Sequence, residues 1–305
     1  MVSAVGLVVH PSKPVAKSVE ALLAFVAGHP VRVLARESDR GRVPAAVEMV
    51  TEEQFVAQVG AVVSLGGDGT MLGAMRLMIP RPVPVLGVNH GNLGFLVEVS
   101  PAELPGALAQ LAAGDFTIEP HPCLEVGTGP DVRYGFNDVV LGRTGRTGSI
   151  SVDLTVNDLH YGYYKGDAVI VSTPTGSTAY NYAAGGPVLS PSSQAMVITP
   201  VAPMAGIGRP VVLGASERLR LTVAEESAPI AVDVDGTVAG ELGRGEQLTA
   251  VMRPDAAQVM RLSASKHASR SRIKLSLLDL PLRRDQLLEL IPPELRRQGP
   301  QISET

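Results

Sequence analysis

The chain has 305 residues but only one cysteine, Cys123, which excludes a disulfide scaffold and a cysteine-rich zinc site. The six histidines are scattered and show no metal-ligand spacing. The net charge is −4 and basic runs are short, so there is no electrostatic case for nucleic acid or an anionic membrane as a partner. The sequence also lacks an apolar stretch long enough to span a membrane and a signal-type N-terminus. These absences predict a protein of the reducing cytoplasm.

Composition and length instead indicate a globular protein. Hydrophobic residues make up 45% of the chain and charged residues 18%, which excludes a disordered chain. A chain of this length can bury two separate cores, so we expect two domains.

The first 117 residues alternate between apolar runs and segments with helical spacing. The apolar runs predict strands at residues 5–9, 31–34, 61–65 and 82–88. The helical spacing predicts helices at residues 15–26, 51–58, 70–79 and 101–112. Such alternation is typical of a Rossmann-like α/β domain, in which helices cover both faces of a mostly parallel sheet. Ligands of these sheets bind beyond the carboxyl ends of the strands.

Residues 118–253 have a different pattern, in which short apolar runs alternate with turns rich in glycine, proline, aspartate and serine. This spacing predicts an all-β, sandwich-like domain. Helical spacing returns in residues 254–295, most clearly at 273–280 and 284–290. We expect this C-terminal segment to pack back on the first domain and complete it. Residues 296–305 form a polar tail.

The segment LGGDGT, residues 65–70, is the most informative part of the sequence. It lies where the predicted strand 61–65 gives way to the predicted helix 70–79, so three glycines surround one carboxylate at the start of a helix. Glycine lets the backbone lie close to a ligand, and free N–H groups at a helix start favour phosphate. An acidic Asp68 beside phosphates indicates a group that handles a proton or a metal. An ordinary Asp-Gly turn capped by Thr70 would contain the same residues.

Four further segments carry small and polar residues where a core would need bulk. They are GVNHGNLGFL at 87–96, NDVVL at 137–141, the stretch 165–187 that includes STPTGSTAYNYAAGGP, and DGT at 235–237. Each segment taken alone is also compatible with an ordinary turn. Ser177 does not lie in a G-x-S-x-G motif and no motif supplies a histidine base, which disfavours a serine hydrolase.

In this order the five segments resemble the NAD kinase family, and the resemblance covers residues 4–280. Its most specific parts are GVNHGNLGFL and GDAVIVSTPTGSTAYNYAAGGPVLSP, whereas GGDGT is shared with diacylglycerol kinases, sphingosine kinases and phosphofructokinases of the same superfamily. The resemblance implies an α/β domain joined to a β-rich domain, with NAD bound between them. It also implies transfer of a phosphoryl group from ATP, or from polyphosphate, to the 2′-hydroxyl of the adenosine ribose of NAD, which yields NADP.

The resemblance also implies roles for individual residues. Asp68 matches the catalytic aspartate, a general base for the ribose hydroxyl. Gly66, Gly67 and Thr70 match residues that hold the donor's phosphates. Mg²⁺ is expected as a cofactor with ATP, without a confident protein ligand. The positions that match NAD-binding residues are Gly69, Phe95, Asn137, Asp138, Lys165, Asp167, Thr175, Thr178, Ala179, Tyr180 and Ala183.

Within that set the resemblance implies different parts of the nucleotide. Asn137 and Asp138 match a pair that binds a ribose through its hydroxyls, to which an amide and an acid offer donors and acceptors. Asp167 matches a residue at the nicotinamide end. Phe95 and Tyr180 match residues beside the adenine, although both are also compatible with core positions.

The sequence departs from the family pattern at three positions. Gly73 stands where a basic residue is frequent, which leaves Arg76 as the cation nearest to GGDGT. Met204 stands where a histidine is frequent. Lys165 replaces a frequent arginine, which keeps the charge but loses the bidentate geometry.

Two other functions are compatible with part of the pattern. A lipid kinase of the same superfamily is disfavoured, because GSTAY and GVNHGNLGFL belong to the NAD branch. A non-catalytic NAD(P)-binding sensor is disfavoured, because LGGDGT is complete and retains Asp68. The exposed strand edges expected in residues 118–253, together with the resemblance, predict a homodimer or homotetramer with Lys165 and Asp167 near a subunit boundary.

Overall fold

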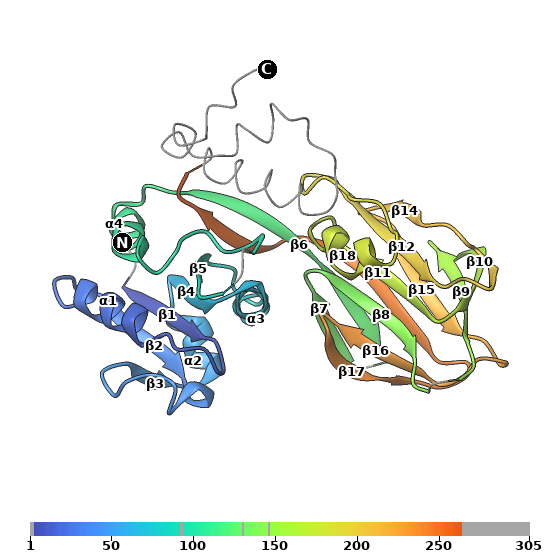
Figure 1. Cartoon of the computed structure of the whole chain (residues 1–305), viewed down its shortest axis with the longest axis horizontal. Coiled ribbons are helices and arrows are strands. Elements are labelled where there is room, and N and C mark those ends of the chain that lie inside the picture. The colour runs from blue at the N-terminus through green and yellow to red at the C-terminus, as the bar shows by residue number, and fades with distance from the viewer. Residues whose placement is uncertain (1–2, 92–93, 130, 146, 264–305) are drawn as a thin grey trace, which may run out of the picture.

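The computed structural model describes residues 3–91, 94–129, 131–145 and 147–263, which form two neighbouring cores (Figure 1). The α/β part comprises β1 Ala4–Val9, α1 Ala16–Val26, β2 Arg32–Arg36, η1 Glu37–Asp39, β3 Glu48–Val50, α2 Glu52–Gln58, β4 Ala61–Gly66, α3 Asp68–Leu77, β5 Pro84–Asn89 and α4 Leu104–Ala113. The β-rich part comprises β6 Thr117–Thr128, β7 Asp131–Gly135, β8 Asp138–Arg143, β9 Ile150–Val156, β10 Leu159–Gly166, β11 Ala168–Ser172, η2 Thr175–Thr178, α5 Tyr180–Ala183, β12 Ala195–Val201, β13 Ala205–Gly206, β14 Val211–Gly214, β15 Arg218–Val223, β16 Ile230–Val234, β17 Thr237–Leu242 and β18 Gln247–Arg261.

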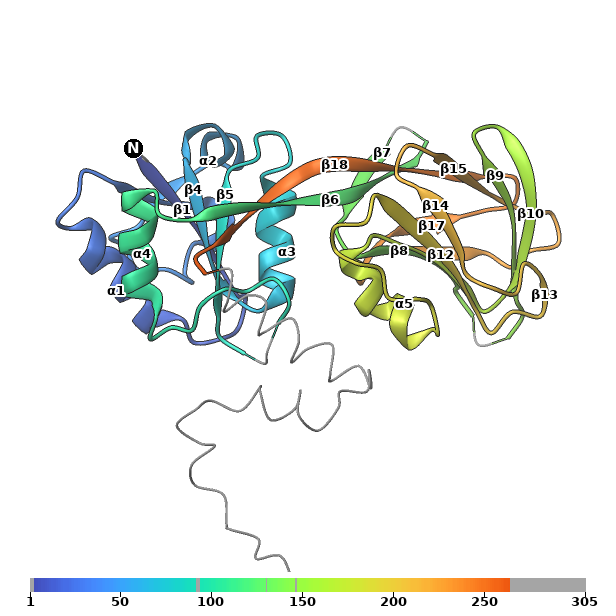
Figure 2. The ribbon, with the colours of Figure 1, turned by 90° about the horizontal axis from the view of Figure 1, so that it is seen from above.

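In the α/β part the strand order is β3-β2-β1-β4-β5, and all neighbours are parallel. Strands β1 and β4 are buried along their whole length, because helices cover both faces of the sheet (Figure 2). On one face α1 and α4 contribute Leu22 and Leu108 to the core, and on the other α2 and α3 contribute Phe55 and Met75. The carboxyl ends of the parallel strands therefore open at one edge, where such sheets bind ligands.

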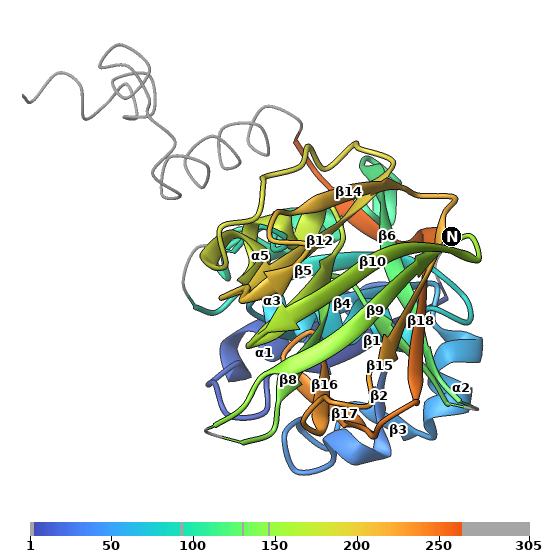
Figure 3. The ribbon, with the colours of Figure 1, turned by 90° about the vertical axis from the view of Figure 1, so that its right-hand side faces the viewer.

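The β-rich part is a sandwich of two sheets, seen from its outer end in Figure 3. One sheet has the order β14-β12-β11-β8-β16-β17, and β13-β10-β9-β15-β18 form the other. Side chains of both sheets share one core, for example Leu141 and Val169 from the first sheet and Leu154 and Leu221 from the second. The short apolar runs between turns are thus the inward faces of a sandwich.

Strands β6 and β18 connect the two parts, because both run from one into the other (Figure 2). β18 pairs with β15 near its start and with β5 near its end, and β6 accompanies it on the other edge. The ladder is interrupted by a bulge between Arg253 and Ala257. One twelve-stranded sheet therefore extends through both cores. The predicted domain limits at 117/118 and 253/254 fall inside these two strands, and the division itself remains a prediction.

The predicted fold class is confirmed, since a parallel α/β domain is followed by a sandwich-like β domain. The strands predicted in the first part do not include β3, which has only three residues. In the β-rich part the alternation of apolar and polar residues is weak in β10, which contains Gly162 and a register shift, and β17 is mostly exposed. The helices predicted at 273–280 and 284–290 and the polar tail 296–305 lie outside the described residues. No helix in the described ranges is long and apolar enough to cross a membrane.

A buried ion pair joins α3 to the sandwich. The side chain of Asp235, in the turn between β16 and β17, is 1% exposed and accepts a hydrogen bond from Arg76 Nη2 at 3.0 Å. The same carboxylate accepts hydrogen bonds from the backbone N–H groups of Phe136, Asn137 and Asp138. Four donors offset the cost of burying this charge. The contacts fix α3 against the start of β8.

Asp138 is a second buried carboxyl at this junction. Burial and the negative charge of Asp235 together raise the pKa of Asp138 to about 7. In the unfolded chain an aspartate has a pKa of about 3.9. At a pH between these two pKa values, the Asp138 carboxyl keeps its proton in the folded protein but has lost it in the unfolded chain. The contribution of Asp138 to the free energy of unfolding is therefore highest below about pH 4 and is lost as the pH rises through about 7.

Asp138→Asn should remove this part of the pH dependence, because the amide has nearly the shape of the protonated acid and does not ionise. Between about pH 5 and about pH 7.5 we expect the free energy of unfolding of the parent to fall by roughly 2 kcal/mol relative to the variant. Urea denaturation of both proteins at the two pH values measures this difference. Parallel pH profiles would show that the pKa of Asp138 is not raised.

Candidate functional site

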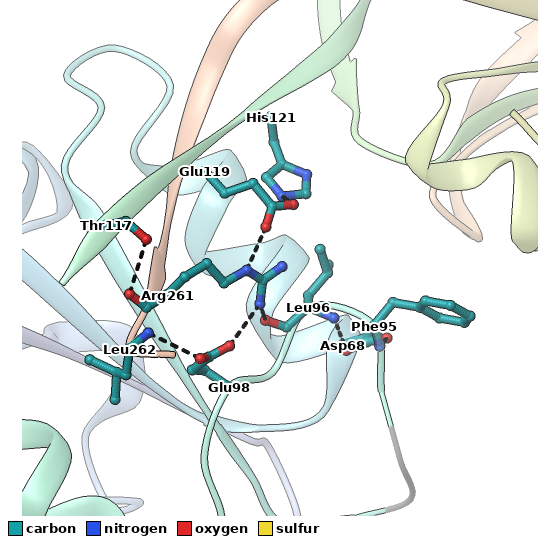
Figure 4. Close-up of polar contacts among 9 residues, drawn as sticks. All are labelled: Asp68, Phe95, Leu96, Glu98, Thr117, Glu119, His121, Arg261 and Leu262. Atoms are coloured by element: carbon teal, nitrogen blue, oxygen red, sulfur yellow. Dashed lines mark hydrogen bonds and ion pairs between the residues drawn. The ribbon is translucent and has the colours of Figure 1, made fainter. Parts of the chain in front are cut away.

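Asp68 begins α3 directly after β4, and its carboxylate faces the loop that follows β5 (Figure 4). Its Oδ2 accepts a hydrogen bond from Phe95 N at 2.6 Å, and its Oδ1 accepts one from Leu96 N at 3.0 Å. Gly94 permits this approach, because a Cβ at that position would overlap the carboxylate. The GGDGT and GVNHGNLGFL motifs therefore meet at one carboxylate.

Arg261, the last residue of β18, holds the same loop (Figure 4). Its Nη1 donates to Leu96 O at 3.0 Å and to Glu98 Oε2 at 3.2 Å, and its Nε donates to Glu119 Oε2 at 2.6 Å. The side chains of Arg261 and Glu98 are 5% and 3% exposed, so each charge depends on its partners for compensation. The loop that binds Asp68 is thus attached to β6 and β18, the strands that the two cores share.

The polar network continues to His121 on β6. His121 Nε2 lies 2.9 Å from Glu119 Oε1, and its Nδ1 lies 3.4 Å from Thr175 Oγ1. Burial by itself raises the pKa of Glu119, but hydrogen bonds from His121 and Arg261 outweigh burial and hold that pKa well below its usual range. A chain of polar contacts therefore links the loop at Asp68 to the segment that follows β11.

A pocket of about 120 Å³ lies where this network meets the segment after β11. It brings together three residues that the sequence predicts for NAD, namely Phe95, Thr175 and Thr178. The rest of its wall is formed by Leu96, Glu119, His121, Pro174, Val188, Leu189, Pro191 and Arg261. A largely apolar wall with one phenyl ring and a few hydroxyl and charged groups is typical of small-molecule sites, but the volume is below the roughly 300–1,000 Å³ of most such pockets.

Asn137 and Asp138 lie beside the same segment, at the start of β8. The backbone carbonyl of Asn137 accepts hydrogen bonds from Thr173 N at 2.9 Å and from Ser172 Oγ at 3.1 Å. Gly176 packs directly on this carbonyl, which a Cβ would overlap. The structure therefore brings the NDVV motif and the STPTGSTAY segment into contact through their backbones.

Two buried side chains hold the STPTGSTAY segment in shape. Ser177 Oγ donates to Pro174 O at 2.6 Å and accepts from Leu189 N at 3.0 Å. Asn181 Nδ2 donates to Ser177 O at 2.9 Å, and Asn181 Oδ1 accepts from Thr199 Oγ1 at 2.6 Å. Ser177 Oγ is therefore engaged in backbone hydrogen bonds, which agrees with the sequence argument that disfavours a serine hydrolase.

The other predicted NAD-binding residues of this segment do not line the small pocket. Ala179 is partly buried and Ala183 is exposed. Tyr180 is 46% exposed, which excludes the alternative that it is a core aromatic. Phe95 is partly buried and lines the pocket, so the core alternative is wrong for this residue as well.

Lys165 and Asp167 lie at the opposite end of β11 from Thr173. The strand between Asp167 and Thr173 spans roughly 20 Å at the usual rise per residue. Asp167 forms an ion pair with Arg143 at 3.4 Å, and both side chains are partly exposed. Within one chain, the structure therefore does not bring Lys165 and Asp167 to the pocket beside His121.

A second cavity, of about 740 Å³, adjoins the GGDGT motif and is lined by Gly67, Gly69 and Thr70. Gly66 does not line it, but a Cβ there would overlap Thr70 Oγ1, so this glycine sets the position of the hydroxyl. The cations on the wall are Lys13, Arg36, Arg42 and Arg76, of which the sequence analysis identified only Arg76. In the described part of the chain, no group of three metal-ligating side chains occurs.

Sequence reasoning also missed the residues that connect the motifs. Glu119 and His121 share one face of β6, because they are two residues apart in a strand, but this spacing alone is a weak signal. Arg261 lies in no motif. Asp235 was singled out with the DGT segment, but its role as an anchor for Arg76 depends on contacts between elements far apart in the sequence.

Two family models match the chain. The model of the ATP-NAD kinase N-terminal domain matches residues 5–116, and that of the ATP-NAD kinase C-terminal domain matches residues 136–262. The chain is 37% identical to the NAD kinase of Gemmatimonas aurantiaca over 237 residues, which cover 75% of this chain and 82% of that protein. It is 35% identical to the NAD kinase of Sulfurimonas denitrificans over 253 residues, which cover 81% of this chain and 88% of that protein.

Two solved structures share the fold. Yeast NADH kinase complexed with NADH has a TM-score of 0.79 at 22% identity and covers 92% of this chain and 89% of its own. An NAD kinase from Archaeoglobus fulgidus in complex with ATP has a TM-score of 0.69 at 21% identity. The match covers 90% of this chain and 98% of that one. The structures support the fold, and the family models span most of the sequence. The chain therefore belongs to the ATP-NAD kinase family.

Proposed function

We propose that this chain is an NAD kinase that transfers a phosphoryl group from ATP to the 2′-hydroxyl of the adenosine ribose of NAD, with Asp68 as the general base. One observation supports the proposal, namely that the residues in contact with Asp68 line two different cavities. Its neighbours Gly67 and Gly69 line the larger cavity, and its carboxylate is bound by the backbone of Phe95, which lines the smaller pocket. A donor in one cavity and an acceptor in the other would both reach this carboxylate.

The reaction needs a base at this place, because a ribose hydroxyl is a poor nucleophile until its proton is accepted. A carboxylate has about four lone-pair positions, so the two backbone N–H groups on Asp68 leave acceptor capacity for a hydroxyl. Mg²⁺ bound with ATP would neutralise charge on the phosphates. Few protein ligands are needed for this ion, because Mg²⁺ commonly binds through substrate phosphates and water.

For NAD, we infer that Phe95, Thr175 and Thr178 contact the adenosine in the smaller pocket. Asn137 and Asp138 offer an amide and a carboxyl to the hydroxyls of a ribose, next to the segment that forms this pocket. Gly69, Ala179, Tyr180 and Ala183 remain contact positions predicted from the family resemblance.

Asp68→Asn should keep the overall fold but lose most of the turnover. The amide can accept only one of the two backbone N–H groups that Asp68 binds, so we expect a smaller loss of NAD affinity as well. The amide keeps the shape of the side chain but cannot accept the proton, so we expect kcat to fall roughly 10²–10⁴-fold. Steady-state kinetics with NAD, ATP and Mg²⁺, together with calorimetry of NAD binding, measure the two effects. A variant with near-normal kcat would rule out the general base. A parent that binds NAD but forms no NADP would instead favour the non-catalytic sensor.

Asp138→Ala should affect binding more than chemistry, because a ribose contact is present in both the ground state and the transition state. Loss of such uniform binding raises KM and spares kcat. We expect NAD to bind more weakly by about 1–3 kcal/mol, the range for losing a partner of a desolvated polar group. Equal NAD affinity of variant and parent in calorimetry would remove Asp138 from the site.

We also propose that the active form is a homodimer or homotetramer. β10 and β13 form an edge of the twelve-stranded sheet (Figure 2). Tyr161, Tyr163 and Met204 are exposed in this part of the chain. An apolar sheet edge needs a cover, and a second copy of the chain would supply one. The same edge carries Lys165, which the chain's own fold keeps away from the pocket beside His121. A neighbouring subunit would bring Lys165 and Asp167 to a nucleotide site.

Tyr163→Glu should weaken this assembly, because it places a charge in the proposed interface. We expect sedimentation at micromolar concentration to give a dimer or tetramer for the parent and a smaller species for the variant. Val238→Glu is the matched control, since Val238 is 77% exposed on β17 in the other sheet and should leave the assembly intact. A parent that is monomeric and fully active would contradict the proposal.

We place the enzyme in the cytoplasm. This proposal rests on the cysteine content of the chain. The chain has one cysteine, Cys123, which is buried and forms no disulfide. Burial raises the pKa of its thiol to about 12, so it stays in the unreactive protonated form. A protein without disulfides suits a reducing compartment.

A further inference from the structure

The larger cavity is formed at the carboxyl ends of β1, β2 and β4 and at the N-terminus of α3. Its apolar wall includes Val9, Pro11 and Leu77. The four cations on the wall, Lys13, Arg36, Arg42 and Arg76, face a single lining carboxylate, that of Glu52. This excess of positive charge favours an anionic occupant.

Two of these cations are held by one buried carboxylate. Asp39 Oδ2 lies 3.1 Å from Arg36 Nε, and Asp39 Oδ1 lies 2.8 Å from Arg42 Nη2. Arg42 Nη2 also donates to Ser38 O at 2.7 Å, and the exposed Glu52 lies 3.3 Å from Arg36 Nη1. Asp39 therefore orients both guanidinium groups, and Asp39 and Glu52 together balance their two charges. The Arg36–Asp39–Arg42 cluster is thus a preformed set of guanidinium donors on the wall of the cavity.

Lys13 adds another charge beside this cluster. His10 Nδ1 accepts hydrogen bonds from the backbone N–H groups of Ser12 and Lys13 at 3.1 and 3.0 Å, which orders the turn after β1. The Lys13 ammonium lies against Gly91, where a Cβ would overlap it. It forms no ion pair with any of the described residues. Lys13 is thus available to an anion in the cavity.

The wall beside α3 has polar atoms that lack a hydrogen-bond partner. Thr70 Oγ1 and Arg76 Nε are buried and unpaired within the described part of the chain. Asp235 compensates the charge of Arg76, so Arg76 does not account for the excess of positive charge on the cavity wall. A Cβ at Gly73 would meet nothing within 4 Å, so space is open on this side of the helix. Both atoms are themselves buried, so the polar side chains that reach the cavity directly are those of the residues that line it.

We propose that Lys13 and the Arg36–Asp39–Arg42 cluster bind the phosphate chain of the phosphoryl donor beyond the group that is transferred. The inference rests on the proposed function, because the cavity adjoins Asp68 through Gly67 and Gly69. A planar guanidinium binds two phosphate oxygens at once, which suits Arg36 and Arg42 to this role. Because these contacts go to phosphates, ATP and inorganic polyphosphate would share them.

Arg42→Gln tests the proposal, because Arg42 is partly exposed and its loss leaves Arg36 on Asp39. Inorganic tripolyphosphate titrated into parent and variant by calorimetry measures binding of the phosphate chain without turnover. We expect its affinity to fall about tenfold and the KM for ATP to rise by a similar factor, as for a lost charge-assisted contact. The KM for NAD should not change.

Arg40→Gln is the matched control, because Arg40 is exposed in the same loop and does not line the cavity. It should bind tripolyphosphate like the parent, whereas Lys13→Met should weaken binding as Arg42→Gln does. Unchanged tripolyphosphate affinity in both Arg42→Gln and Lys13→Met would overturn the inference. An equal loss in Arg40→Gln would also overturn it, because the effect would then be one of general charge.

Failure of the proposed function is distinguishable from failure of this inference. In that case the parent would form no NADP, while Arg42→Gln would still weaken tripolyphosphate binding.

Discussion

The paired strands β6 and β18 are the constraint on which the rest of the structure depends. β18 hydrogen-bonds to β15 in the sandwich and to β5 in the parallel sheet, so one ladder belongs to both cores. A shared ladder limits the relative movement of the two parts more than a flexible linker would. The bulge between Arg253 and Ala257 is the one irregularity of β18 along its pairing with β6. The pocket beside His121 owes its shape to this connection, because Glu119, His121 and Arg261 all lie on these two strands.

Buried charges reinforce the connection at two points. Asp235 joins Arg76 of α3 to the backbone of residues 136–138, and Arg261 joins Glu119 to the loop that binds Asp68. Each buried charge is costly unless it is paired and hydrogen-bonded, so removing one partner would leave the other uncompensated. Such contacts add less to net stability than an apolar core does. What they supply is orientation, because hydrogen bonds fix the angles at which backbone segments meet.

The two cavities differ in which of the two cores forms them. The larger one is formed almost entirely by strand ends and loops of the α/β part, whereas the smaller one needs Phe95 from that part and Thr175 from the sandwich. Residues beside Asp68 line both, because β4 ends there and because Gly94 lets the loop with Phe95 approach the carboxylate of Asp68. Position 73 carries no basic side chain, but Lys13, Arg36 and Arg42 from other loops line the same cavity.

The sequence by itself determined the fold class, the motifs and the family resemblance. Apolar runs such as 61–65 need burial on both faces, and glycines such as Gly94 mark close backbone approaches, so these features are visible locally. Tertiary structure alone decided which motifs meet. Arg261 contacts Leu96 across more than a hundred residues, Arg42 joins Arg36 through Asp39, and Asp167 lies at the far end of β11 from Thr173. Periodicity reports which face of an element is buried but not its neighbours, because those depend on how the strands cross between the two cores.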